Sequence, residues 1–190
     1  MANDIRVASY FPYPPVLSVN PDYSKLIRNI PDFPKPGIVF KDITTLLVDA
    51  AALDESINQL VAPFVAQDVD IVVGIESRGF IFGTPAARQL QAGFVPIRKP
   101  GKLPFDRLSA SYTLEYGTDE VEIHRDAISS GSRGLLVDDL LATGGTMEAA
   151  VNLINQLEGT ILGISFLIEL AFLGGREKLN GQAVYSIIKY

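Results

Sequence analysis

Two adjacent carboxylates followed by a short turn of small residues form the part of the sequence best suited to chemistry. Asp138 and Asp139 follow the apolar run Leu135–Val137, and the segment Ala142–Thr146 (ATGGT) comes shortly after them. Along an extended chain, neighbouring side chains point to opposite sides, so the two aspartates can reach different groups. The Gly-Gly turn offers amides and hydroxyls at the start of a helix, which suits a phosphate monoester. The aspartates suit neutral hydroxyl donors such as those of a ribose.

The same segment also allows other interpretations. An Asp-rich strand end and a Gly-Gly turn capped by Thr146 could occur with no ligand at all. A dinucleotide-binding loop is the other phosphate interpretation, but the Gly-x-Gly-x-x-Gly spacing is absent. Adjacent acids with Ala-Thr-Gly-Gly-Thr at this spacing favour a phosphorylated sugar.

Charge and composition narrow the classes of function. The net charge is −6, which argues against nonspecific nucleic-acid binding. Between Arg78 and Arg107, however, six basic residues face one acid, Asp106. Such a local cationic stretch suits a small polyanion, with a solvated basic face as the alternative. The chain has no cysteine and a single histidine, His124, which excludes disulfides and thiol nucleophiles and argues against a structural zinc site.

The sequence predicts a soluble, cytoplasmic protein. The N-terminus lacks the basic and apolar pattern of a secretory signal. The apolar stretch 159–175 contains Glu169 and is short for a membrane span. Two core segments meeting at a turn explain this stretch better.

Strand-like and helix-like segments alternate along the chain, which predicts an α/β fold with a mainly parallel sheet flanked by helices. Ligands of such sheets bind beyond the carboxyl ends of the strands. We expect an irregular N-terminal arm over residues 1–22 and a single domain over 23–190. The expected helices are 53–65, 85–90 and 146–157, and the expected strands are 71–75, 94–98, 135–137, 161–168 and 184–188.

The segment Val137–Thr146 resembles the 5-phosphoribosyl-1-diphosphate (PRPP) motif of the type I phosphoribosyltransferases. The resemblance implies that family's fold, with a small N-terminal hood and a flexible lid loop. It also implies that Asp138 and Asp139 hold the ribose hydroxyls. The 5′-phosphate of PRPP would be bound by Ala142, Thr143, Gly144, Gly145 and Thr146.

Further segments are similar to the adenine branch of this family, and the resemblance spans roughly residues 27–190. It implies transfer of the 5-phosphoribosyl group of PRPP to N9 of adenine, giving AMP and diphosphate. Mg²⁺ would bind mainly through the diphosphate and water, without a protein metal site. The family is usually homodimeric, and the resemblance implies no nucleic-acid or membrane partner. The matching segments are Pro31–Ile43, Glu76–Phe80, Arg98–Pro104, Leu114–Gly117 and Gly175–Leu179.

The resemblance also assigns the diphosphate contacts. Arg78 would meet the diphosphate after a turn at Glu76–Ser77 that often holds a cis peptide in this fold. Arg98, Lys99 and Lys102 would clamp the diphosphate, with Arg98 acting across a dimer interface. Surface ion pairs and surface charges are the structural alternatives for these residues.

Four residues complete the implied site. Glu115 would manage the purine proton near N7, and Tyr116 would contact PRPP. Backbone groups of Val39 would read the adenine edge, and Phe40 would stack on its ring. The alternatives are an outward strand glutamate for Glu115, a half-buried strand aromatic for Tyr116 and a plain core aromatic for Phe40.

Two questions stay open at the level of sequence. Residues 100–116 could form a mobile lid that keeps water from the reactants, or an ordinary hairpin. The function could also be transfer to another base, such as a 6-oxopurine or orotate, or PRPP sensing without catalysis. The adenine-like segment 31–42 argues against another base. The lack of a basic helix or appended domain argues against a regulator.

Overall fold

The computed structural model describes residues 22–113 and 117–190, which form two compact units divided between Glu55 and Ser56. The first unit contains an antiparallel pair of short strands, in which Arg28 lies opposite Asp42. The Pro-rich loop between these strands, residues 32–38, is irregular. Helix α2 (Ala50–Val61) crosses the division between the units. The other elements of the first unit are η1 (Tyr23–Leu26), β1 (Arg28–Pro31), β2 (Val39–Asp42) and α1 (Thr44–Leu47).

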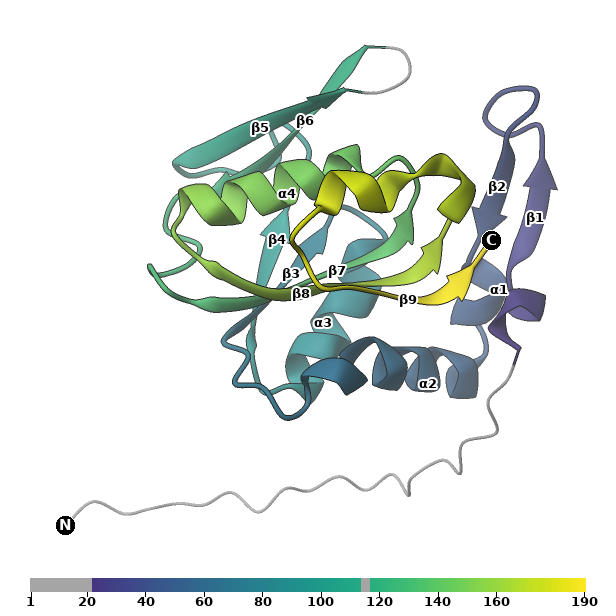
Figure 1. The fold of residues 1–190 in the computed structure, drawn as a ribbon, viewed down its shortest axis with the longest axis horizontal. Helices are drawn as coiled ribbons and strands as arrows, with labels where there is room; N and C mark the ends of the chain where they lie inside the picture. The colour runs from purple at the N-terminus through teal and green to yellow at the C-terminus, as the bar shows by residue number, and fades with distance from the viewer. Residues whose placement is uncertain (1–21, 114–116) are drawn as a thin grey trace. The chain divides into compact units, whose positions relative to one another are not determined.

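The second unit is built on a five-stranded sheet in the order β4-β3-β7-β8-β9, and every neighbouring pair is parallel. Helix α3 (Gly79–Gln89) packs against β3, β4 and β7 on one face, and α4 (Gly145–Gln156) lies on the other (Figure 1). This confirms the predicted α/β fold with a parallel sheet between helices. The strands are β3 (Ile71–Ile75), β4 (Gly93–Ile97), β7 (Arg133–Leu141), β8 (Thr160–Glu169) and β9 (Val184–Lys189).

A separate antiparallel pair, β5 (Arg107–Thr113) and β6 (Thr118–His124), packs on α4. A single bridge between Arg98 and Glu122 joins β6 to the end of β4. Within the segment 100–116, residues 107–113 form β5 and pair with β6, whereas residues 100–106 lie outside the strands, and lid closure stays a prediction. Three short 3₁₀ helices complete the unit: η2 (Ala62–Phe64), η3 (Ala171–Leu173) and η4 (Gly175–Leu179).

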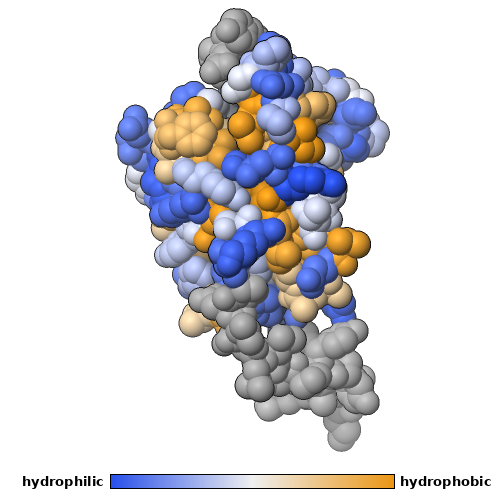
Figure 2. All heavy atoms as spheres, turned by 90° about the vertical axis from the view of Figure 1, so that its right-hand side faces the viewer, coloured by the Kyte–Doolittle hydropathy of each residue, from blue (hydrophilic) through white to orange (hydrophobic). Residues whose placement is uncertain are grey.

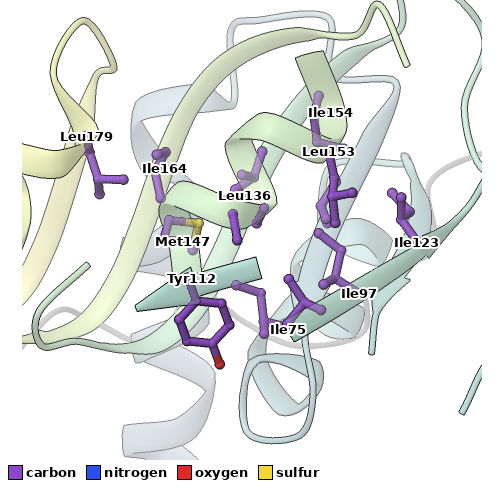
Figure 3. Packing of buried hydrophobic residues seen from close by; sticks show 14 of the residues in the cluster. Ile75, Ile97, Tyr112, Ile123, Leu136, Met147, Leu153, Ile154, Ile164 and Leu179 are labelled. Carbon is purple, nitrogen blue, oxygen red and sulfur yellow. The ribbon is translucent and has the colours of Figure 1, made fainter. Parts of the chain in front are cut away.

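The core lies between the sheet, α4 and the β5–β6 pair. Figure 3 shows Ile75, Ile97 and Leu136 from the sheet together with Leu153 from α4 and Ile123 from β6. Alternate residues of each strand face this side, since side chains of a strand alternate between the two faces. Burial on both faces explains why the parallel strands are runs of Val, Ile and Leu.

Three sequence expectations about element boundaries were wrong. The helix expected over 53–65 is α2, which begins at Ala50 and ends at Val61, where a 3₁₀ turn that contains Pro63 follows. Helix α3 begins at Gly79, six residues before Pro85, because the chain turns directly into the helix: the amides of Phe80 and Ile81 bond to Ser77 and Arg78 carbonyls, each at 3.2 Å. Strand β7 continues past residue 137, since its backbone stays paired with β8 as far as Leu141.

Within the described ranges, no helix is both long enough and apolar enough to cross a membrane. On the face drawn in Figure 2, hydrophobic and hydrophilic side chains are interspersed.

Candidate active site

The two adjacent aspartates lie near the carboxyl end of β7, the central strand of the sheet. Asp139 is buried, with 4% exposure, and its amide donates to Asp138 Oδ1 at 2.9 Å. Asp139 Oδ2 lies 3.0 Å from Arg78 Nε. The carboxylates therefore sit at the sheet edge where ligands of such folds bind.

Their environment raises the pKa of both carboxyls. Desolvation, together with the negative charge of Asp139, raises the pKa of Asp138 well above its usual range. Desolvation also raises the pKa of Asp139, although the Arg78 guanidinium opposes this. A ligand that offers hydroxyl donors or a cation would relieve the cost of holding these charges.

Arg78 reaches the aspartates because the start of α3 lies against β7. A Cβ on Gly79 would come within 2.8 Å of Asp138 Oδ1 and 3.1 Å of the Val137 carbonyl oxygen. A side chain at position 79 would therefore push against the Asp138 carboxylate and the β7 backbone. The Glu76–Ser77 peptide that precedes Arg78 is cis, as the resemblance implied.

The small-residue turn closes one side of the site. Gly144 adopts φ +81° and ends the turn, and α4 begins at Gly145. No side chain caps this helix from the N-cap position. Together with Asp138, residues 140–147 line a small cavity of about 80 Å³. The amides and positive dipole end of a helix N-terminus favour an anion at this place.

The residues predicted to clamp diphosphate, Arg98, Lys99 and Lys102, follow β4, and the first two face carboxylates of the same chain. Arg98 Nε lies 3.1 Å from Glu76 Oε2, which also accepts the Lys99 amide at 3.1 Å. Lys99 Nζ contacts the Asp119 carboxylate and donates to Tyr112 Oη at 2.8 Å. Desolvation of Lys99 lowers its pKa, but the hydrogen bonds to Asp119 and Tyr112 outweigh it and raise the pKa.

The buried side chain of Glu122 fixes the loop that carries the clamp. Glu122 Oε2 accepts the Gly101 amide at 3.1 Å, and Oε1 accepts Arg107 Nε at 2.8 Å. Its backbone exchanges two hydrogen bonds with Arg98, at 2.9 and 2.8 Å. The loop from residue 98 to 107 is thus held along its length by one residue of β6.

The comparisons with known proteins point to one family. The family model described as phosphoribosyl transferase domain matches residues 41–180. An adenine phosphoribosyltransferase of Halothermothrix orenii is 58% identical over 168 residues, which cover 88% of this chain and 99% of the relative. The chain belongs to the adenine phosphoribosyltransferase family.

Solved structures of this family share the fold. The enzyme of Thermoanaerobacter pseudethanolicus gives a TM-score of 0.85 at 53% identity, covering 88% of this chain and 97% of the other. The Saccharomyces cerevisiae enzyme, solved in complex with an imino-altritol bisphosphate and adenine, gives 0.82 at 41% identity, with coverage of 86% and 95%.

The structure gathers part of the site that membership of the adenine phosphoribosyltransferase family implies. It brings Arg78, Asp138 and Asp139 together beside the turn of residues 142–146, and it joins Arg98 and Lys99 through Glu76. Lys102 is exposed, and its carbonyl accepts Arg98 Nη1 at 3.2 Å.

The structure does not test the other residues that the family resemblance implies. Val39 and Phe40 are on β2 in the first unit, where Val39 is exposed and the Phe40 ring meets the Phe33 ring edge-on at 5.2 Å. Glu115 and Tyr116 lie outside the described residues.

Sequence reasoning assigned no role to Asp119, Glu122 or Tyr112. Asp119 and Tyr112 face each other in the β5–β6 register, and both reach Lys99. The alternation of apolar residues over 108–112 and 121–123 is the signal that could have paired these strands. The partner of each cation still depends on the fold, since the contacts join residues about twenty positions apart.

Proposed function

We propose that this chain is an adenine phosphoribosyltransferase that transfers the 5-phosphoribosyl group of PRPP to N9 of adenine, releasing AMP and diphosphate for purine salvage. The observation that carries the proposal is the pair Asp138 and Asp139, which lies between the Arg78 guanidinium and the phosphate-binding turn. Relatives at 54–58% identity over most of the chain carry this name. The Saccharomyces cerevisiae neighbour was solved with adenine.

In the proposed complex, the turn of residues 142–146 binds the 5′-phosphate through its amides and hydroxyls. Asp138 and Asp139 accept hydrogen bonds from the ribose hydroxyls. Displacement at the anomeric carbon develops positive charge on the ribose, which the two carboxylates stabilise. No covalent nucleophile is required.

The leaving diphosphate is bound by Arg78, Arg98, Lys99 and Lys102. Arg78, Arg98 and Lys99 already face carboxylates, so on binding diphosphate each cation replaces one anionic partner with another. Cations whose contacts strengthen as charge moves onto the leaving group lower the barrier selectively.

Mg²⁺ fits this donor set, and we propose it as the cofactor. Among residues 22–113 and 117–190, no group of three or more His, Asp or Glu side chains is placed to hold a metal ion. Mg²⁺ commonly binds through one or two carboxylates plus substrate phosphates and water. Asp139 Oδ2 already pairs with Arg78 Nε at 3.0 Å, so the ion would bind mainly through the diphosphate and water, with Asp138 and Asp139 holding the ribose hydroxyls beside it. When bound, Mg²⁺ supplies charge neutralisation of the diphosphate.

We assign the adenine edge to the Val39 backbone and the stacking face to Phe40. Glu115 handles the proton near N7 as N9 attacks, and Tyr116 contacts PRPP. The segment 100–116 closes as a lid and keeps water from the activated ribose. These roles rest on the resemblance of the segments that carry them.

We propose a homodimer, a cytoplasmic location and a single catalytic domain over residues 23–190 preceded by an arm over 1–22. The exposed apolar side chains of the described chain and the absence of cysteine are in keeping with the dimer and with a reducing compartment. Family analogy carries the rest.

A spectrophotometric assay tests the function. Purified protein receives PRPP and Mg²⁺ with adenine, hypoxanthine, guanine or orotate offered separately. We expect AMP from adenine alone, and strong loss in Asp138→Ala and Glu115→Ala. Turnover of another base would remove the specificity claim, and PRPP binding without any turnover would indicate a sensor.

A further inference from the structure

The tightest backbone contact near the site involves a segment to which we have assigned no role. A Cβ on Gly144 would lie 2.3 Å from the Gly175 carbonyl oxygen, and a Cβ on Gly175 would lie 2.1 Å from the Ala142 carbonyl oxygen. Both distances are far below any real Cβ contact, so only glycine fits at either position. The start of η4 therefore lies directly against the turn of residues 142–146, so Gly175 is part of the packing that holds that turn in place.

The residue after Gly175 anchors this segment to the sheet. Arg176 Nε donates to Glu169 Oε1 at 2.9 Å, and Nη2 donates to Glu169 Oε2 at 2.5 Å. Nη1 donates to the Val184 carbonyl at 2.8 Å, and Ser186 Oγ donates to Glu169 Oε2 at 2.6 Å. One guanidinium thus joins η4 to the end of β8 and to β9. Two parallel bonds from a planar fork fix direction as well as distance.

The anchor point is itself next to the site. Glu169 is the last residue of β8 and lies opposite Leu141, the last residue of β7 before the turn. The amide of Leu170 donates to the Leu141 carbonyl at 2.9 Å. At the other end of η4, Leu179 is buried in the core cluster that also contains Met147 and Ile164 (Figure 3). Gly175 is therefore held from both sides.

The pair is also well formed electrostatically. Glu169 is buried, and the hydrogen bond from Arg176 lowers the pKa of its carboxyl to about 2, so it stays ionised at neutral pH. Removing Arg176 leaves the buried Glu169 carboxylate, at the carboxyl end of β8, without its main counter-ion, which destabilises the folded state. The surrounding backbone would then move.

We propose that Arg176 and Glu169 are positioning residues for the 5′-phosphate: they touch no substrate, but they hold Gly175 against the turn of residues 142–146 and so set the geometry of the phosphate-binding amides. The inference rests on the proposed function in one respect, that this turn binds the 5′-phosphate. It predicts a selective defect. Binding of the ribose phosphate should suffer, while the diphosphate contacts of Arg78 and Lys99, which come from α3 and the β4 loop, should not.

Binding measurements on the full chain test this selectivity. Isothermal titration would give the dissociation constants of ribose 5-phosphate and of inorganic diphosphate with Mg²⁺, and thermal unfolding would be recorded alongside. We expect Arg176→Met to weaken ribose 5-phosphate about ten- to a hundredfold, in line with the cost of small misplacements, and to leave diphosphate within twofold. Arg176→Lys keeps the charge but loses the fork, and it should fall between.

A matched control lies at the opposite end of the same sheet. Arg133 pairs with the exposed Asp68 at the amino end of β7, with Nη1 3.1 Å from Asp68 Oδ2. Arg133→Met removes an arginine ion pair far from the turn and should leave both ligands unaffected. If Arg176→Met fails to fold, Arg176→Lys and Ser186→Ala replace it in the test, since each removes only some of the hydrogen bonds to Glu169.

The outcomes separate this inference from the catalytic proposal. Ribose 5-phosphate binding needs neither adenine nor turnover. If the enzyme assay failed but Arg176→Met still weakened ribose 5-phosphate binding alone, only the proposed reaction would be wrong. Equal weakening of both ligands, or an unchanged ribose 5-phosphate affinity in a folded Arg176→Met, would overturn the positioning role.

Discussion

At the scale of single residues, three cations of the candidate site already face carboxylates before any substrate binds. Arg78 faces Asp139, Arg98 faces Glu76, and Lys99 faces Asp119. Each cation is thereby oriented by a carboxylate that a phosphate can later replace. Asp138 is the exception, because its neighbours add negative charge and desolvation without a direct cationic partner among the contacts described.

This imbalance predicts a variant that gains stability while it loses function. A raised pKa means that Asp138 binds its proton more tightly in the folded protein than in the unfolded chain. The contribution of Asp138 to the free energy of unfolding is therefore favourable below about pH 4, the pKa of an aspartate in the unfolded chain. This contribution is lost as the pH rises through the pKa of Asp138 in the folded protein. Asp138→Asn, which keeps an acceptor for the Asp139 amide, should raise Tm at pH 7.5 by a few degrees, at about 2–4 °C per kcal/mol.

Calorimetry at pH 7.5 and at pH 4 measures the effect. The gain in Tm should shrink toward zero at pH 4, and kcat/KM should fall about a hundredfold at pH 7.5. Asp126→Asn, at an exposed position, is the control and should change neither quantity. An Asp138→Asn protein that is less stable at both pH values would show that the carboxylate is not under electrostatic stress.

At the scale of elements, periodicity was enough to place the sheet but not the contacts between strands. The run at 71–75 coincides with β3, and the helix expected from residue 146 begins one residue earlier. The start of α3 could not be predicted, because Gly79 packs closely against Asp138, about sixty residues away in the sequence. Local propensity instead favours Pro85 as a first-turn residue.

The site shows the same division. The acids and the glycine turn are contiguous in sequence, so their grouping was visible from the sequence alone. The partners of the cations were not, because Asp119 and Glu76 meet Lys99 and Arg98 only through strand pairing. Gly175 likewise meets Gly144 through a crossover that no local pattern encodes.

The β1–β2 pair allows a prediction about the base. Asp42 ends β2, the strand that carries Val39 and Phe40; it accepts Arg28 Nε and the Thr44 amide, both at 2.9 Å. Asp42→Asn keeps an acceptor for Thr44 but loses the charge that binds Arg28, which should loosen the register of the pair. We expect KM for adenine to rise severalfold with KM for PRPP unchanged.

Steady-state kinetics with each substrate varied in turn decides this. Asp49→Asn is the matched control, because Asp49 caps the start of α2 through the amides of Ala51 and Ala52, and asparagine caps equally well. If both KM values rose together in Asp42→Asn, the strand would serve stability and not the base.

At the scale of the whole molecule, several large apolar side chains of the described residues are exposed to solvent. Val48, Phe105 and Phe172 are 83%, 61% and 73% exposed. Figure 2 shows hydrophobic residues reaching the surface between hydrophilic ones. Scattered apolar residues of this kind are ordinary, so the expectation of a dimer comes from the family resemblance.

We therefore predict a particle of twice the 20.6 kDa chain mass in light scattering, in which Arg98 acts in the site of the partner subunit. Within one chain the Arg98 guanidinium faces Glu76, so an Arg98 that reaches into the partner's site would leave Glu76 and bind diphosphate instead.

Co-expression of Arg98→Met with Asp138→Asn tests this crossing and should restore activity, because one site of each mixed dimer combines an intact Asp138 with an intact Arg98. Asp138→Asn with Asp139→Asn must stay inactive, since both changes fall within a single chain's site. A mixed dimer without activity in the first pairing would return Arg98 to its own chain's site, beside Glu76.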